Sequence, residues 1–137
     1  MKQFQQNFGR LILRFGIGGF MLFHGISKLS HGIDGLVAMF DRQGLPGMIA
    51  YLVYLGEVVA PILLLIGYRT KLASLAIAIT MVVAMIIAHA DEILKLGDHG
   101  EWALEVLGLY LLGAIALLFL GGGKFGNSAH IERNYLA

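Results

Sequence analysis

Four long apolar segments limit what this chain can fold into. They lie at about residues 10–29, 46–67, 72–90 and 102–122, and each is close to the roughly 20 residues that a helix needs to cross a hydrocarbon core of about 30 Å. With 58% hydrophobic residues, 14% charged residues and a mean hydropathy of +0.77, the chain is far more apolar than a soluble domain. The sequence therefore predicts an all-α fold, a transmembrane four-helix bundle.

The segments between these spans are too short to bury a core of their own, so residues 1–137 are expected to form a single integral membrane domain. The first span contains Arg14, and no small-residue cleavage site follows it. We therefore expect it to be a retained span and not a signal peptide.

The distribution of charge predicts the topology. Most basic residues lie before the first span, between the second and third, and after the fourth, whereas the other two loops are mainly acidic. Because basic residues concentrate on the cytoplasmic side, both termini are expected to be cytoplasmic.

The loop at 30–44 is the one loop with an internal pattern. Ile33, Leu36, Val37 and Phe40 recur at helical spacing, which predicts a short helix lying on the outer surface. An ordinary surface loop with a few buried side chains is the alternative. Small residues within the spans, Gly16, Gly18, Gly19 and Gly25 among them, predict close contact between helices.

Cysteine is absent from the sequence. This excludes disulfides, thiol relays, iron–sulfur clusters held by thiolates and c-type haem attachment. A redox role would therefore require a bound molecule. No basic stripe with interleaved aromatic residues is present, so nucleic acid is not an expected partner.

Six ionisable residues lie within the apolar spans. An ionised side chain at the centre of a bilayer costs about 2.5–3.5 kcal/mol on insertion scales, so each needs a partner or a function. At helical spacing Arg14, Gly18, Gly25 and Lys28 share one face of the first span. That face is expected to point inward and to form a polar pocket open toward the outer surface, together with the other members of the set, which are His24, Glu57, His89 and Glu105.

Glu57 stands four residues before Pro61. Because proline has no N–H, the carbonyl of Glu57 loses its helical partner, and its carboxylate and carbonyl become available at one depth. A kink at this point is expected to form part of a site. A kink that serves helix contact alone is the alternative.

Each ionisable residue also has a structural explanation. Arg14 and Lys28 can extend to the two interfaces, Glu57 can pair with Arg14 only to hold two helices in register, and His89 can be an interfacial residue. These alternatives stay open at the level of sequence.

Several chemistries can be compared for such a pocket. His24 and His89 could ligate a b-type haem, and Glu57 with Glu105 could complete a metal site, but the E-x-x-H spacing of di-iron bundles is missing. A polar-headed hydrophobic ligand such as a quinone fits better. Its carbonyl oxygens need donors such as His24 or Lys28, and a carboxylate can handle the protons that accompany reduction.

Two stretches, RFGIGGFMLFHGISKL and GEVVAPILLLIGYRTKLASLAIAITMVVAM, resemble the DoxX family of small bacterial four-helix membrane proteins. The residues that carry the resemblance are Arg14, Gly25, Lys28, Glu57, Gly67 and Arg69. The resemblance implies a multi-pass protein of the bacterial cytoplasmic (inner) membrane. It also implies a link to thiosulfate and quinone redox chemistry or to responses against quinones and oxidants. His24 and His89 are not part of this pattern.

The sequence thus predicts a membrane component of a redox or oxidant and quinone detoxification system that binds a quinone-like molecule. Glu57 is the predicted proton handler, with Arg14 and Lys28 as its charge partners and His24, His89 and Glu105 as further ligand contacts. The expected partners are the lipid bilayer, the hydrophobic ligand, a soluble redox protein and further copies of the chain. The alternatives are a non-catalytic scaffold that recruits a soluble oxidoreductase, a haem or metal-binding subunit, and a small transporter. Whether the chain is an enzyme by itself stays open.

Overall fold

The computed structural model of this chain describes residues 1–126, and within them the fold is helical. The described part has no strand, and its one β feature is an isolated bridge between Leu96 and Trp102. The all-α prediction is confirmed for this part of the chain. In chain order the elements are α1 (Lys2–His31), α2 (Asp34–Arg42), η1 (Gly47–Leu52), η2 (Leu55–Val59), α3 (Ala60–Ile66), α4 (Thr70–Ala88), η3 (Ala90–Glu92) and α5 (Glu105–Leu120).

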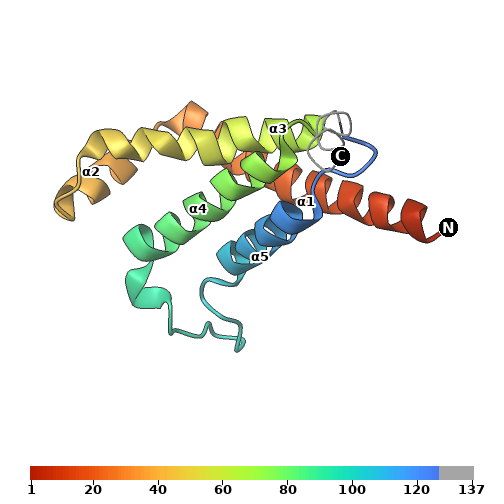
Figure 1. Ribbon diagram of the computed structural model, residues 1–137. Coiled ribbons are helices and arrows are strands. Elements are labelled where there is room, and N and C mark those ends of the chain that lie inside the picture. Colours follow the sequence, from red (N-terminus) through yellow and green to blue (C-terminus); the bar gives the residue numbers. More distant parts are fainter. Residues whose placement is uncertain (127–137) are drawn as a thin grey trace.

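The long helical segments contact one another in a ring. α1 packs against α3 and α5, and α4 packs against the same two helices from the other side. Figure 1 shows that α4 and α5 run beside each other and cross the direction of α1 and α3. The N-terminal end of α1 projects beyond the other helices (Figure 1).

Two helical runs, Gly47–Ile66 and Thr70–Ala88, are long and apolar enough to cross a membrane, and each has a mean hydropathy of 2.3. α5 is apolar but shorter. It begins at Glu105 and not at Trp102 as expected, because Trp102 pairs with Leu96 in the isolated bridge and its indole N–H donates to the carbonyl of Ile93 at 2.7 Å. α1 is longer than the expected span, since it begins at Lys2.

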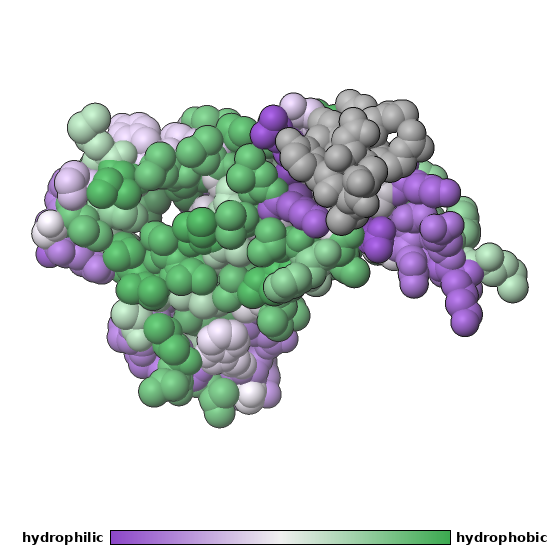
Figure 2. Space-filling model, viewed as in Figure 1, coloured by the Kyte–Doolittle hydropathy of each residue, from purple (hydrophilic) through white to green (hydrophobic). Residues whose placement is uncertain are grey.

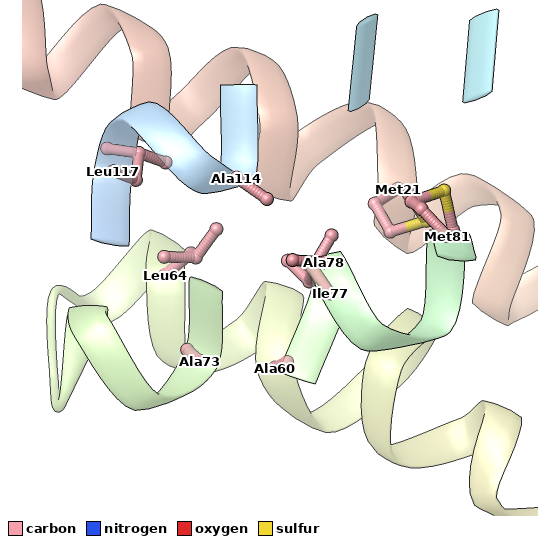
Figure 3. Packing of buried hydrophobic residues seen from close by; sticks show 9 residues of the cluster. All are labelled: Met21, Ala60, Leu64, Ala73, Ile77, Ala78, Met81, Ala114 and Leu117. Atoms are coloured by element: carbon pink, nitrogen blue, oxygen red, sulfur yellow. The ribbon is translucent and has the colours of Figure 1, made fainter. Parts of the chain in front are cut away.

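The main core lies where the four long segments meet, and Figure 3 shows its side chains pointing toward one another from α1, α3, α4 and α5. Alanine supplies four of its nine members, so the helix backbones approach closely. In a membrane, where lipid is as apolar as the side chains, such close van der Waals contact is a main source of helix association. The members are Met21, Ala60, Leu64, Ala73, Ile77, Ala78, Met81, Ala114 and Leu117.

The segment after α1 forms a helix, as its apolar spacing indicated. α2 packs on η1 and forms a second core of Ile33, Phe40 and Ala50. Its C-terminal end is held to α4 by the side-chain amide of Gln43, which donates to the carbonyl of Ile87 at 2.7 Å. α2 therefore covers one end of the molecule and is attached to two other elements.

The glycines of α1 divide into two groups. A Cβ at Gly25 would overlap the carbonyl of Glu57, and one at Gly18 would lie 3.1 Å from the carbonyl of Pro61. These two glycines let α1 approach the neighbouring backbone. By contrast, a Cβ at Gly16 or Gly19 would have nothing within 4 Å. The expectation of close helix contact is therefore wrong for these two, because they point away from the helices that α1 packs against.

We predict that Gly25→Ala lowers the thermal stability of the protein, because the new methyl group would overlap the backbone carbonyl of Glu57 and α1 would have to move away from it. Overpacking of this kind typically costs about 1–3 kcal/mol. The measurement is the temperature at which the detergent-solubilised protein loses its monodisperse elution peak. Gly19→Ala, the same change on the open side of α1, serves as the control and should leave this temperature unchanged or slightly higher. Equal effects of the two changes would contradict the close contact at Gly25.

Candidate functional site

An ion pair between α1 and η2 is the centre of the candidate site. The Nζ atom of Lys28 lies 2.5 Å from Oε1 of Glu57. The Lys28 side chain is 35% exposed and that of Glu57 only 6%. A carboxylate this deeply buried requires a partner, since an unpaired buried charge is strongly destabilising. The predicted pairing of Lys28 with Glu57 is confirmed in geometry.

The backbone around Glu57 departs from an α-helix. Residues Leu55–Val59 form a π-helical turn, and the N–H that closes it, from Ala60, bonds to the carbonyl of Leu55. Pro61 follows and cannot donate to the carbonyl of Glu57. Single π turns of this kind occur frequently at functional sites. The predicted interruption of the helix at Glu57 is therefore present.

The carbonyl of Glu57 has a different neighbour from the one expected. It faces Gly25 of α1, so it belongs to the contact between helices and not to the pocket. On the other side of the turn, a Cβ at Gly56 would overlap the side chain of Thr80 on α4. The turn that carries Glu57 is thus held between α1 and α4, because Gly25 and Gly56 each allow a close contact there.

Arg14 has different partners from those predicted. Its guanidinium donates to the carbonyls of Leu64 at 2.9 Å, Leu65 at 3.1 Å and Gly122 at 3.1 Å, and the residue is 1% exposed. The prediction that Arg14 pairs with Glu57 is wrong. At 1.5 Å per residue, about 21 Å of helix separates Arg14 from Lys28. Because Lys28 is the residue of α1 that lies beside Glu57, Arg14 lies near the far end of α3. There the carbonyls at the ends of α3 and α5 are natural acceptors for a cation.

A cavity of about 260 Å³, here called the polar cavity, lies between α1, η2, α4 and α5. Its wall contains five side chains with polar groups, which are His24, Lys28, Glu57, His89 and Tyr110. The rest of the wall is apolar and includes Met21 and Met81 of the main core. Four of the six predicted site residues are therefore brought together around one space.

A second and larger cavity adjoins the first. It has a volume of about 510 Å³ and lies between α2, η1, η2 and α4. Its wall is almost wholly apolar, so we call it the apolar cavity. The two cavities share Lys28, Glu57, Ala84 and His89. The ion pair of Lys28 and Glu57 and the imidazole of His89 thus lie at the junction of the polar cavity and the apolar cavity.

The two predicted histidines take different roles in the wall. The ring of His24 is exposed and meets the ring of Tyr110 edge to face, with 5.9 Å between the centroids. His89 follows the last residue of α4, and its Nδ1 lies 3.0 Å from Oε2 of Glu92. Both face the space that contains Lys28 and Glu57.

Glu105 is not part of this arrangement. It is the first residue of α5, is exposed, and lies in the wall of neither the polar nor the apolar cavity. At the start of a helix a carboxylate is stabilised by the helix dipole. Among the described residues no group of three or more His, Cys, Asp or Glu side chains could hold a metal ion.

Two polar residues of the site were not among the predicted ones. Tyr110 lies in the middle of the fourth apolar segment, where a phenol is as unusual as a charged side chain. Glu92 lies three residues after His89, a spacing at which the two side chains can meet.

The comparisons with known proteins identify a family and one named relative. A family model described as DoxX matches residues 9–90, which include α1 from Gly9 onward, η2 and α4 but not α5. The Bacillus subtilis (strain 168) protein named "Putative oxidoreductase CatD" is 32% identical over 78 residues, which cover 57% of this chain and 58% of that relative. The chain thus matches less than two thirds of the relative's length. No solved structure matches the chain.

We predict that Arg14→Lys destabilises the protein, because a single ammonium group cannot reach three carbonyls that the guanidinium bridges. Leaving buried acceptors without donors costs about 1–3 kcal/mol for each group. Thermal unfolding in detergent measures the change. Arg42→Lys, at the exposed end of α2, is the control and should have almost no effect. Wild-type stability of Arg14→Lys would contradict the anchoring role of this residue.

A double-mutant cycle tests the ion pair. We predict that Lys28→Met and Glu57→Gln each lower the free energy of unfolding, and that the combined variant is more stable than the sum of the two losses implies, because the second change removes the charge that the first left unpaired. Lys95→Met, in the loop before α5, combined with Glu57→Gln should be additive. Additivity in both cycles would mean that Lys28 and Glu57 do not interact.

Proposed function

Because this chain belongs to the DoxX family, we propose that it is a membrane component of a redox or oxidant and quinone detoxification system. In this proposal a quinone-like hydrophobic molecule binds in the polar cavity, where Lys28, Glu57, His24 and His89 meet. Glu57 handles the protons that accompany reduction of the ligand, and Lys28 is its charge partner.

We place the protein in the bacterial cytoplasmic membrane as a multi-pass four-helix bundle with both termini in the cytoplasm. The outer surface supports this placement, because large apolar side chains are exposed on α1, α4 and α5, with Phe23 70%, Phe119 79% and Leu112 65% exposed. Figure 2 shows that hydrophobic residues cover the middle of the molecule, while hydrophilic ones gather at its ends. An apolar surface of this extent is typical of contact with lipid.

The junction of the two cavities is the observation that carries the proposal. Ligand sites are concave and mostly apolar, and they contain a few polar groups that fix the orientation of the ligand. Here a carboxylate that is 6% exposed lies beside an apolar space of about 510 Å³. An amphiphile can place its polar ring near Lys28, Glu57 and His89 and its hydrophobic part in the apolar cavity.

The name of the Bacillus subtilis relative describes an oxidoreductase, and this supports redox chemistry as the setting. The electrons that reduce the bound quinone would come from a soluble partner protein, since the chain has no cysteine to hold a thiol relay or an iron–sulfur cluster. The ionisable groups of the cavity would supply and accept protons.

A non-catalytic scaffold is the second candidate. It is favoured by the engagement of Arg14 with three backbone carbonyls, which shows that a buried charge in this chain can serve helix attachment alone. In a scaffold the pair of Lys28 and Glu57 would have the same purpose, and the cavities would hold no specific ligand.

Binding of a defined quinone separates the two candidates. We predict that the protein in lipid nanodiscs binds decylubiquinone and its reduced form, decylubiquinol, and that Glu57→Gln weakens binding of the reduced form about tenfold or more, because its hydroxyl group can donate to the carboxylate. Isothermal titration calorimetry measures the affinity, with empty nanodiscs as the blank. Glu105→Gln makes the same chemical change outside both cavity walls and should bind as the wild type does.

The absence of saturable binding by the wild-type protein would contradict the proposed function and favour the scaffold. Equal weakening by the changes at Glu57 and Glu105 would place the ligand outside the polar cavity. A lipid extract of the purified protein offers a second readout, because bound quinone is detected by its absorption change on reduction.

A further inference from the structure

The arrangement around His89 carries an inference about which chemical form of the ligand this site prefers. It rests on the proposed function, because it concerns the same cavity. We infer that the site selects a hydroxyl-bearing aromatic amphiphile, a phenol or hydroquinone with an apolar tail, over the form that has only carbonyl or ether oxygens. His89 accepts the hydroxyl hydrogen, and Glu92 is the residue that positions it.

The first step concerns the hydrogen on the imidazole. Nδ1 of His89 lies 3.0 Å from Oε2 of Glu92. An ionised carboxylate can only accept a hydrogen bond, so Nδ1 carries the hydrogen. In the neutral ring Nε2 is then an acceptor. A carboxylate that holds one nitrogen of an imidazole in this way fixes the tautomer and leaves the other nitrogen as a base.

The second step places that base next to the ligand space. His89 belongs to the walls of both cavities. Glu92 holds the Nδ1 edge from η3, on the side of the loop, and both side chains are about two-fifths exposed, at 39% and 43%. The opposite edge, which carries Nε2, is therefore the one available to the cavities.

The third step compares donors and acceptors at the junction. The ammonium group of Lys28 is already engaged by Oε1 of Glu57 at 2.5 Å. The other carboxylate oxygen, Oε2 of Glu57, is buried and accepts no hydrogen bond from any part of the described chain. Oε2 of Glu57 and Nε2 of His89 thus receive no hydrogen bond from residues 1–126. A ligand that offers a hydroxyl hydrogen complements this junction, whereas a ligand with acceptors alone does not.

The position of Glu92 makes the inference specific to this chain. It lies two residues beyond Ala90, the last residue that the DoxX model matches. It acts through His89 and is a positioning residue, and its loss should change which ligand binds more than whether the protein folds.

The test uses two probes that differ in a single group. 4-Decylphenol donates a hydroxyl hydrogen, and its methyl ether, 4-decylanisole, cannot. Both resist redox change under the assay conditions and carry the same tail. Titration calorimetry in nanodiscs at about pH 8, where imidazole side chains are mostly neutral, should show the phenol binding about tenfold more tightly to the wild-type protein.

Glu92→Gln is the decisive variant. Its carboxamide can donate to Nδ1 as well as accept from it, so the tautomer of His89 is no longer fixed and Nε2 is no longer always an acceptor. The preference for the phenol should fall below that of the wild type, with Oε2 of Glu57 as the remaining acceptor, and the ¹⁵N chemical shifts of His89 should report the altered tautomer. Asp91→Asn is the matched control: it removes the neighbouring exposed carboxylate, and both the preference and the shifts should stay as in the wild type.

Two results would overturn the inference: equal affinity of the wild-type protein for the two probes, or a preference for the phenol that Glu92→Gln leaves undiminished. If decylubiquinone binds in either case, the proposed function stands while the preference for hydroxyl groups fails. If neither the decyl probes nor decylubiquinone binds, the proposed function itself fails. His89→Gln gives a second check, since it should lower the preference without changing Glu92.

Discussion

The ion pair of Lys28 and Glu57 is the interaction on which the rest of this structure depends. A carboxylate that is 6% exposed is tolerated in an apolar interior only when a cation meets it. Because the pair joins α1 to the turn η2, it fixes how far the two antiparallel segments slide past each other. That register then brings Gly25 against the backbone of Glu57 and Arg14 to the end of α3. One electrostatic requirement thus accounts for several contacts that lie far apart in the sequence.

The molecule has two parts with different properties. Near Arg14 the helices are close together through small residues such as Ala73 and Ala114, and a buried guanidinium joins the ends of α3 and α5. Beyond Met21 and Met81, which belong both to the core and to the wall of the polar cavity, space opens between the helices. The tight part holds the helices in place, and the open part offers polar groups beside an apolar volume. Ligand chemistry belongs to the open part.

Much of this could be predicted from the sequence, and the reasons are physical. A period of 3.6 residues places Arg14, Gly18, Gly25 and Lys28 on one face of a helix, and that face is the one α1 turns toward its neighbours. Pro61 removes a donor at a known distance from Glu57, which locates the interrupted turn. The preference of a charged group for a partner within an apolar segment indicated the pairing of Lys28 with Glu57.

Other features were beyond the reach of pattern alone. The partners of Arg14 depend on the relative height of three helices, and residue types do not show which backbone carbonyls will accept a hydrogen bond. A carboxylate partner was therefore expected, and this expectation is wrong. Gly16 and Gly19 point outward because of the rotation of α1 about its axis, and residue type alone does not indicate this rotation. Glu105 was expected in the same pocket as His89, yet α5 begins with Glu105 and leaves it outside both cavity walls. Tyr110 and Glu92 become visible as site residues only once α4 and α5 are placed beside each other.

The central claim is that Lys28 and Glu57 meet inside the protein, between two helices, and border a shared interior space. A solid-state NMR measurement in lipid bilayers tests it most directly, with ¹⁵N at the lysine side-chain nitrogens and ¹³C at the glutamate carboxyl carbons, and with Lys28→Arg to assign the signal. The account predicts a strong dipolar coupling between the Nζ atom of Lys28 and the carboxyl carbon of Glu57, as expected for a contact distance. The absence of this coupling, with both side chains directed separately to the lipid headgroups, would contradict it.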